Sequence, residues 1–383
     1  MTTTADSAPG HENADRIRVV LVFGGVSSEH SISCLTAASV ASAIDTRRYE
    51  VTGLGITPGG RWTPYTLDEI RAFTVVDGVL PSLADDRPDA VLVHTAEGVF
   101  VAGLDGEAHV GGPRPVDVAM PVLHGPFGED GTVQGYFEML GLRYTGAGVA
   151  ASAIGMDKQM MKLVLAGSGL PIGGFTTILP GQWEADREAC RAAVADLGLP
   201  VYVKPARGGS SVGISRVDSL DELDAAVVEA RRWDPKVIVE TGFVGAREIE
   251  CAVLGDLDGS GPRTSRVGEI RMHTDSGFYD FGAKYLPEEQ VTLDVPATIA
   301  PGLEQRVREV AARTFTAVAA EGLGRVDVFV TADGEVVVNE INTMPGFTRY
   351  SMFPMLWQAS GMSYPEVIDD LITQALRRPV GLR

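Results

Sequence analysis

The stretch GRVDVFVTADGEVVVNEINTMPG, residues 324–346, decides the fold. It contains two apolar runs typical of β-strands with Asp333-Gly334 between them, and this dipeptide is a strong signal for a tight hairpin. A two-residue loop at Asp333-Gly334 places Asp327 directly opposite Glu340, whereas a loop of odd length would shift the pairing by one residue. We therefore expect two carboxylates to face each other across neighbouring strands.

This opposed pair needs a compensating charge, because like charges at paired positions destabilise a hairpin. A divalent cation would supply it, and oxygen ligands suit Mg²⁺. Asn342 lies on the same face, since strand side chains alternate, and adds a third oxygen. Arg325 shares that face, so an ordinary ion-pair network is the alternative. Because Mg²⁺ usually keeps phosphate ligands, the metal interpretation predicts a phosphate-binding segment elsewhere in the chain.

The segment VYVKPARGGSSVGISRV, residues 201–217, is the candidate for phosphate binding. A strand carrying Lys204 leads into a glycine-rich loop, and such loops let backbone N–H groups approach an anion. The loop lacks the GxxxxGK[ST] spacing of a P-loop and joins strand to strand, so a flexible hairpin is the alternative. Lys204, and Lys158 in the segment GMDKQMMK, favour the phosphate interpretation.

Composition narrows the class of protein. The chain has 383 residues, of which 45% are hydrophobic and 22% charged, with a net charge of −19. This acidity argues against nucleic-acid binding, which needs clustered basic residues. The sequence contains no apolar run of membrane-spanning length, which argues against a membrane partner. Three widely spaced cysteines form no metal or disulfide pattern, which predicts a cytoplasmic location.

The order of apolar runs predicts an α/β protein with several domains. A buried strand at 17–23, a glycine pair and a helical pattern form the opening unit of an α/β domain. Strands are expected at 49–56, 90–93, 116–122, 175–179, 201–204 and 237–240, and helices at 156–166, 191–197 and 220–232. We divide the chain into a disordered tail (1–15), an N-terminal α/β substrate domain (16–154), a central domain (155–243) and a C-terminal domain (244–383). Residues 57–107 are expected to contain a surface insertion without an assigned role.

Several motifs occur together and in one order: GGVSSEHSIS, HGPFGEDGTVQG, YTGAGVAASAIGMDK, VKPARGGSSVGIS, FYDFGAKY, GRVDVFV and NEINTMPG. In these motifs the chain resembles the ATP-grasp enzymes, and among them the D-alanine–D-alanine ligase family. The resemblance covers nearly the whole chain beyond the tail. It implies a three-domain ATP-grasp architecture with an N-terminal open α/β (preATP-grasp) domain. It also implies ATP, two Mg²⁺ ions with Mn²⁺ as an alternative, and a homodimer.

The resemblance assigns residues to the nucleotide and its metal ions. Asp327, Glu340 and Asn342 match the metal ligands. Glu240 matches a position near the adenine amino group, and Glu248 matches the acid that binds ribose, with Glu250 as its rival. The residues implied in ATP binding are Lys158, Lys204, Ser211, Glu240, Phe243, Glu248 and Lys284. For Lys284 the alternative is an exposed lid charge.

The resemblance also assigns the amino-acid substrates. Glu29 and His124 match residues at the first D-alanine, although a helix first-turn acid and a structural histidine are the alternatives. Glu129 matches a supporting residue beside them. The second D-alanine is expected at Gly346, Ser351 and Met352.

Four residues are assigned to catalysis: Glu29, Ser210, Tyr285 and Arg325. Tyr285, in a lid loop at about 272–289, is implied to link Ser210 and Glu29. Arg325 and the backbone N–H of Gly346 are implied to stabilise an oxyanion. The proton of the attacking amine is expected to pass to Tyr285, Ser210 or the departing phosphate.

The implied activity is the ATP-dependent ligation of two D-alanines through a D-alanyl phosphate, for peptidoglycan precursor synthesis. Tyr285 favours an amine as the attacking group over the hydroxyl of D-lactate. The alternatives are a related ligase with D-lactate or another amino acid as second substrate, and a non-catalytic nucleotide-binding regulator. A dinucleotide-dependent oxidoreductase is disfavoured, because the segment VFGGV, residues 22–26, lacks the GxGxxG spacing.

Overall fold

The first sheet is built by the N-terminal part of the chain. The computed structural model describes residues 16–104, 112–209, 212–256, 258–272 and 291–381. The sheet has the order β3-β2-β1-β7-β8, with β3 antiparallel at one edge and the other strands parallel. Its elements are β1 (Ile17–Gly24), α1 (His30–Ala43), β2 (Tyr49–Ile56), β3 (Trp62–Tyr65), α2 (Leu67–Arg71), β7 (Val118–Pro121), α3 (Thr132–Met139) and β8 (Arg143–Tyr144). The apolar run of β1 is buried along most of its length, as a central parallel strand requires.

A separate three-stranded antiparallel sheet lies beside this unit. It has the order β4-β5-β6, formed by β4 (Ala90–Thr95), β5 (Gly98–Gly103) and β6 (Arg114–Val116). The strand expected at 116–122 corresponds to β7, while its first expected residue, Val116, ends β6 in the other sheet. Residues 57–107 also supply β3 of the main sheet, so the segment expected to contain an insertion is only partly separate.

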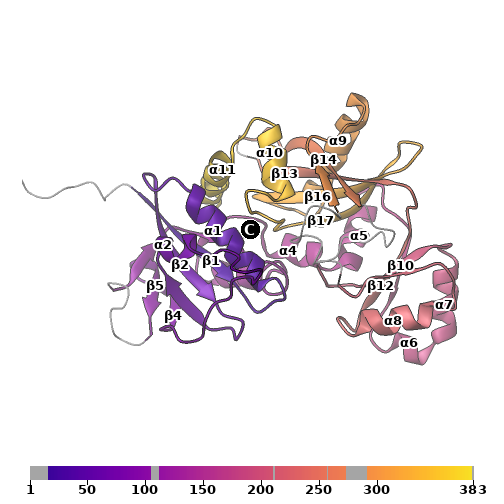
Figure 1. Ribbon diagram of the computed structural model, residues 1–383, viewed down its shortest axis with the longest axis horizontal. Helices are drawn as coiled ribbons and strands as arrows, with labels where there is room; N and C mark the ends of the chain where they lie inside the picture. Colours follow the sequence, from indigo (N-terminus) through magenta and orange to yellow (C-terminus); the bar gives the residue numbers. More distant parts are fainter. Residues whose placement is uncertain (1–15, 105–111, 210–211, 257, 273–290, 382–383) are drawn as a thin grey trace, which may run out of the picture.

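The central unit is a four-stranded antiparallel sheet with the order β11-β10-β12-β9. Its elements are β9 (Phe175–Ile178), α6 (Gln182–Ala185), α7 (Arg187–Ala195), β10 (Val201–Pro205), β11 (Ser215–Val217), α8 (Leu223–Arg231) and β12 (Val237–Thr241). The glycine-rich loop joins β10 to β11, which confirms a strand-to-strand connection. In Figure 1 this unit stands at the right, away from the first sheet.

Two helices precede the central sheet where one was expected. α4 covers Val149–Met156 and α5 covers Lys158–Gly167. The break falls at Asp157, whose extended backbone and side chain cap α5 by accepting from the N–H groups of Gln159 and Met160. The cap makes Lys158 the first residue of α5, so its backbone N–H is free of the helix and donates to the carbonyl of Ala206 at 2.9 Å.

The third sheet has the order β15-β14-β13-β16-β17 and is antiparallel throughout. Its elements are β13 (Arg247–Leu254), β14 (Arg263–Met272), β15 (Val291–Asp294), α9 (Pro301–Ala317), β16 (Leu323–Val330), β17 (Val336–Asn342), α10 (Met352–Ala359) and α11 (Tyr364–Arg377). The apolar side of α9, including Val307, Ala311 and Phe315, lies in one core cluster with the buried valines of β13, β16 and β17. Burial of this face holds the β16–β17 hairpin in place.

The two-residue loop predicted for this hairpin is wrong, although the predicted pairing is correct. Thr331 pairs with Glu335 around a three-residue loop in which Gly334 has a φ of 79°. Such a loop shifts the register by one residue, as the pair Val328–Val338 shows. A β-bulge at Asn339 then inserts one residue in β17 and restores Asp327 opposite Glu340. The second irregularity cancels the first at the position where the carboxylates lie.

The last helix joins the first and third sheets. Asp369 of α11 accepts hydrogen bonds from Arg48 and from the Tyr49 hydroxyl at the start of β2. Just beyond α11, the guanidinium of Arg378 donates to the carbonyls of Tyr144 and Gly146, at 3.2 and 2.9 Å. These contacts hold the N-terminal unit against the C-terminal unit, between which α10 and α11 lie in Figure 1.

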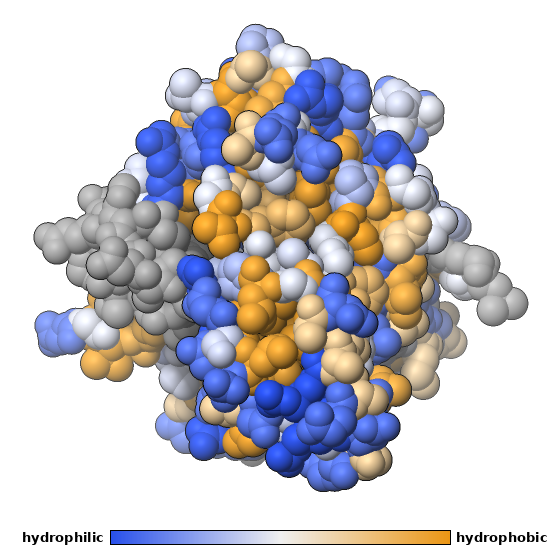
Figure 2. All heavy atoms as spheres, turned by 90° about the vertical axis from the view of Figure 1, so that its right-hand side faces the viewer, coloured by the Kyte–Doolittle hydropathy of each residue, from blue (hydrophilic) through white to orange (hydrophobic). Residues whose placement is uncertain are grey.

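Hydrophobic side chains are distributed between several cores and the surface. Each of the three larger sheets has its own buried cluster, and one cluster continues from the first sheet onto α10 and α11. Figure 2 shows apolar residues gathered along the middle of one face between polar margins. Among the described residues, no helix has both the length and the apolar character needed to cross a bilayer.

Candidate active site

Two adjoining cavities open where the three sheets meet. The first is lined by Lys158, Lys162, Lys204, Glu240 and Phe243, together with glycines of the β10–β11 loop. The second is lined by residues from all three units, including Glu29, His124, Arg325, Asp327, Gly346, Ser351 and Met352. Glu129, Gly209, Glu248, Glu340 and Asn342 line both cavities. The structure therefore brings the described residues of the predicted site into one connected space.

The acidic hairpin lies at the boundary between the two cavities. Nε and Nη2 of Arg325 donate to the two carboxylate oxygens of Asp327, both at 2.7 Å, and Asn342 Nδ2 donates to Asp327 Oδ2 at 2.9 Å. Glu250 Oε2 lies 3.1 Å from Arg325 Nε. Burial alone would lower the pKa of Arg325, but Asp327 and Glu250 outweigh it and raise that pKa. The ion-pair network that is the alternative to a metal site is therefore present, and it engages the Asp327 oxygens that a metal ion would use.

The hairpin nevertheless offers a donor set suited to a hard cation. Two carboxylates, Asp327 and Glu340, pair across the strands, with the Asn342 amide on the same face. Oxygen donors of this kind suit Mg²⁺. Within the described ranges, no three or more His, Cys, Asp or Glu side chains gather around a position for a metal ion. The hairpin supplies two carboxylates and an amide, a set that leaves ligand positions for phosphate.

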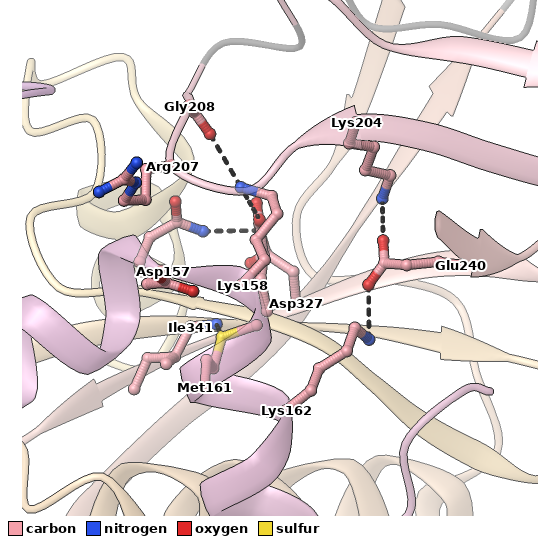
Figure 3. A network of polar contacts seen from close by, with 12 residues as sticks. Asp157, Lys158, Met161, Lys162, Lys204, Arg207, Gly208, Glu240, Asp327 and Ile341 are labelled. Atoms are coloured by element: carbon pink, nitrogen blue, oxygen red, sulfur yellow. Dashed lines mark hydrogen bonds and ion pairs between the residues drawn. The ribbon is translucent and has the colours of Figure 1, made fainter. Parts of the chain in front are cut away.

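Lys158 connects the acidic hairpin with the glycine-rich loop. Its Nζ donates to the carbonyl of Gly208 at 2.8 Å and lies 3.5 Å from Glu340 Oε2. Figure 3 shows this side chain directed from the start of α5 toward the loop above it. A positive charge between a phosphate-loop backbone and a metal-type carboxylate is well placed for a nucleotide phosphate.

Glu240 lies between two lysines. Its carboxylate is 2.8 Å from Lys162 Nζ through Oε1 and 2.5 Å from Lys204 Nζ through Oε2, an arrangement visible in Figure 3. Burial opposes ionisation of this acid, but Lys204 and Lys162 outweigh burial and hold its pKa at about 2. Burial likewise opposes the charge on Lys204, and Glu240 reverses this, so that the pKa of Lys204 is raised.

An aromatic pair lines the first cavity near these lysines. The rings of Phe243 and Phe329 stack with centroids 5.3 Å apart and an interplanar angle of 27°. Phe243 packs so closely on Gly173 that a Cβ there would lie 2.8 Å from the ring. Flat apolar walls of this kind suit a planar base.

The two candidate ribose acids lie on one face of β13 at different depths. Glu248 is opposite Phe329 and lines both cavities, whereas Glu250 is opposite Asp327 and lines only the second. Burial, followed by the nearby Asp327, raises the pKa of Glu248. Because Glu250 contacts Arg325, Glu248 is the better placed of the two for the nucleotide.

Glu29 and His124 lie together at the N-terminal wall of the second cavity. Glu29 precedes α1, and its Oε2 lies 3.1 and 3.5 Å from the positions where Gly125 and Gly209 would carry a Cβ. His124 is buried, with Nδ1 3.5 Å from Glu129 and Nε2 3.2 Å from the Thr36 hydroxyl. Burial lowers the pKa of His124, but Glu129 and then Glu29 outweigh it and raise that pKa. This wall can thus present both a carboxylate and an imidazolium.

Gly346, Ser351 and Met352 form the opposite wall of the second cavity. The Ser351 hydroxyl lies 2.8 Å from the Thr348 hydroxyl and accepts from its backbone N–H at 3.2 Å. A Cβ on Gly346 would lie 3.1 Å from that hydroxyl. Met352 is the first residue of α10 and is buried. The predicted carboxylate-binding segment therefore starts at a helix N-terminus, where backbone N–H groups are available.

Some predicted site residues lie outside the described part of the chain, and one residue of the first cavity was not predicted. Ser210, Ser211, Lys284, Tyr285 and most of the lid loop lie outside the described residues. Lys162 was missed by the sequence argument. Its signal is its position four residues after Lys158, which places both lysines on one side of α5.

Two family descriptions match separate segments that together span most of the chain. The family description "D-ala D-ala ligase N-terminus" matches residues 18–147, and "D-ala D-ala ligase C-terminus" matches residues 164–373. A D-alanine--D-alanine ligase from Kineococcus radiotolerans is 51% identical over 372 residues, covering 96% of this chain and 98% of the relative. Another from Arthrobacter sp. (strain FB24) is 49% identical and covers 98% of each chain.

Solved structures resemble the fold over nearly its full length. The D-alanine-D-alanine ligase from Coxiella burnetii has a TM-score of 0.80 at 30% identity, covering 95% of this chain and 94% of that one. The VanG D-Ala:D-Ser ligase from Enterococcus faecalis has a TM-score of 0.79 at 32% identity, covering 94% and 99%. Two antiparallel sheets flanking a lysine- and acid-lined cleft, behind an N-terminal α/β unit, define an ATP-grasp fold. Within that class, the chain belongs to the D-alanine–D-alanine ligase family.

Proposed function

We propose that this protein ligates two D-alanine molecules to D-alanyl-D-alanine, with ATP as the energy source and a D-alanyl phosphate as intermediate, for peptidoglycan precursor synthesis. The observation that supports the proposal is that a cavity lined by Lys158 and Lys204 shares wall residues with a cavity lined by Glu29 and Arg325. Two relatives about half identical to this chain are D-alanine--D-alanine ligases.

The first cavity would hold ATP. Phe243 and Phe329 would form an apolar wall beside the base, Glu240 would accept from its amino group, and Glu248 would bind the ribose. Lys158 and Lys204 would bind the phosphates, because both can turn from protein acceptors to phosphate oxygens. Positioning and charge stabilisation are what phosphoryl transfer chiefly requires of a protein.

The acidic hairpin would hold divalent cations. Asp327, Glu340 and Asn342 would supply ligands for two Mg²⁺ ions, with Mn²⁺ as an alternative. When bound, the ions would neutralise phosphate charge. With Asp327 engaged by a metal ion, Arg325 would still have Glu250 as a partner at the boundary of the cavities.

The second cavity would hold both amino acids. Glu29 would bind the ammonium group of the first D-alanine, and His124 would lie at its carboxylate. That carboxylate attacks the γ-phosphorus of ATP, ADP leaves, and an acyl phosphate forms. The amine of the second D-alanine, once deprotonated and with its carboxylate held by Gly346, Ser351 and Met352, attacks the acyl carbon.

The oxyanion that forms would lie between Arg325 and the backbone N–H of Gly346. Phosphate then leaves and the amide bond is complete. Ser210, Lys284 and Tyr285 keep their implied roles in this scheme, as do the adjacent Ser211 and the lid. A homodimer and a cytoplasmic location are proposed from the family resemblance, and sedimentation analysis and cell fractionation test them.

The decisive experiment measures phosphate release with ATP and Mg²⁺, supplying D-alanine, L-alanine, or D-alanine with D-lactate or D-serine, and identifies the products by mass. The expected result is turnover with D-alanine alone, giving the dipeptide. Turnover only with a second compound would replace the second substrate but keep the ATP-grasp chemistry. Binding of ATP without turnover under any of these conditions would favour a regulatory protein.

A further inference from the structure

Lys162 and Glu240 form a buried ion pair in the wall of the proposed nucleotide cavity. The relative accessibility of the Lys162 side chain is only 3%, and its ammonium contacts one oxygen of Glu240, while Lys204 contacts the other. Both oxygens of this buried acid are therefore occupied by lysines. If Lys204 turned to the nucleotide phosphates, as proposed above, Glu240 Oε2 would lose its lysine and could accept from the amino group of adenine.

Lys204 is the lysine that can leave. It lies at the end of β10, directly before the glycine-rich loop, and its side chain is more accessible, at 14%. Lys162 instead extends from the second turn of α5 and is among the least accessible charged side chains of the described residues. If Lys204 left without a second cation present, a buried carboxylate would remain unpaired, and such a state is strongly unfavourable.

We propose that Lys162 is a positioning residue for nucleotide binding, acting as a fixed counter-charge that lets Glu240 exchange Lys204 for the amino group of adenine. This inference rests on the proposed use of ATP. As the phosphates draw Lys204 away, Lys162 keeps the carboxylate ionised and oriented, and Oε2 becomes free to accept a hydrogen bond from the base. Recognition of the base and capture of the phosphates are thereby coupled through one side chain.

The coupling predicts a defect that depends on the base. The test measures dissociation constants by calorimetry, with Mg²⁺ but without amino acids, for ATP and for purine riboside triphosphate, which carries hydrogen in place of the amino group. A hydrogen bond to a charged acceptor is worth roughly ten- to hundredfold in affinity, so wild-type protein should prefer ATP by about that factor. In Lys162→Met, Glu240 stays with Lys204, and the preference should fall to about one.

Several variants separate this role from a structural one. Lys162→Arg should restore most of the preference, and Lys162→Gln carries the same test if the methionine variant does not fold. Lys236→Met removes another ion-paired lysine, which is 12% accessible and lies 2.7 Å from Asp157, and should leave the preference unchanged. In a Glu240→Gln background, Lys162→Met should cause no further loss of preference, because the acceptor it positions has been altered.

Two results would overturn the inference. One is equal weakening of both nucleotides in Lys162→Met with the preference intact. The other is the absence of any preference in wild-type protein. Because these measurements contain no D-alanine, failure of the proposed ligation leaves them interpretable, and the dipeptide assay on wild-type protein reports that failure separately.

Discussion

Replacing Glu340 by glutamine should raise the Mg²⁺ concentration needed for turnover about a hundredfold while leaving the fold intact. The substitution keeps the shape of the side chain and removes one of two carboxylates that face each other across the β16–β17 hairpin. Its ion pair in the structure is with Lys158, at 3.5 Å. A partly exposed pair of this kind contributes about 0–1 kcal/mol, and the change also relieves repulsion from Asp327.

The effect on metal binding should be much larger. At an effective dielectric constant of about 20, two unit charges about 4 Å apart interact by roughly 4 kcal/mol, and a divalent ion doubles this figure. Desolvation offsets a large part, which leaves a net loss of roughly 3 kcal/mol. That loss corresponds to an affinity for Mg²⁺ that is about a hundredfold lower. Stability should change by less than about 1 kcal/mol, or about 2–4 °C in melting temperature.

The assay follows phosphate release against Mg²⁺ concentration, with thermal unfolding measured on the same preparations. Glu335→Gln is the matched control, because Glu335 is an exposed glutamate beside the same hairpin loop and should behave as wild type in both measurements. A Glu340→Gln protein that responds to Mg²⁺ like wild type would remove Glu340 from the metal site. A protein that fails to fold would show that the acid is structural.

Three further predictions concern stability and catalysis. The pKa of Glu240 is lowered from 4.5 to about 2 in the folded protein. This shift contributes roughly 3 kcal/mol to the free energy of unfolding above pH 4.5, and the contribution is lost as the pH falls toward 2. The difference in urea stability between wild type and Glu240→Gln should therefore shrink across that range, and a constant difference would contradict the assignment. Gly322→Ala should lower the melting temperature by more than Gly361→Ala. Both glycines have positive φ, but only at Gly322 would a Cβ meet backbone, 2.6 Å from Gly146. Equal losses would show that φ alone decides the cost of the substitution. Arg325→Lys keeps the charge but loses the paired contacts to the Asp327 carboxylate, so kcat should fall about a hundredfold with ATP affinity nearly unchanged. A normal kcat would exclude the oxyanion role.

The hairpin illustrates how far sequence reasoning reaches. The predicted pairing of Asp327 with Glu340 rested on a two-residue loop, and it is correct because a bulge cancels the extra loop residue. Alternation correctly predicted that Arg325 and Asn342 share the face of this pair. The loop was predicted with one residue too few, because an Asp-Gly pair fits both two- and three-residue hairpins. The bulge at Asn339 was not predicted, because an extra residue in one strand is defined only by its pairing with the other strand.

The lysines show a different limit. Lys158 and Lys204 were identified because each lies beside a glycine-rich or motif segment, a signal contained in the chain itself. The partnership of Lys162 with Glu240 joins α5 to β12 across 77 intervening residues of sequence, and only the three-dimensional fold brings them together. Charged residues in a helix usually face solvent, so a lysine inside such a pair reads like any other surface lysine.

Because Asp369 contacts Arg48 and Tyr49, the N-terminal sheet cannot dock on the last helix until nearly the whole chain has been synthesised. The partners are separated by about 320 positions in the chain, so the N-terminal sheet leaves the ribosome long before the helix that anchors it exists. That sheet can form early, since most of its pairings are internal, but its docking must wait for almost the last residues to emerge. Until then the apolar face that later receives α11 is exposed, and a chain truncated before Asp369 would keep it exposed permanently.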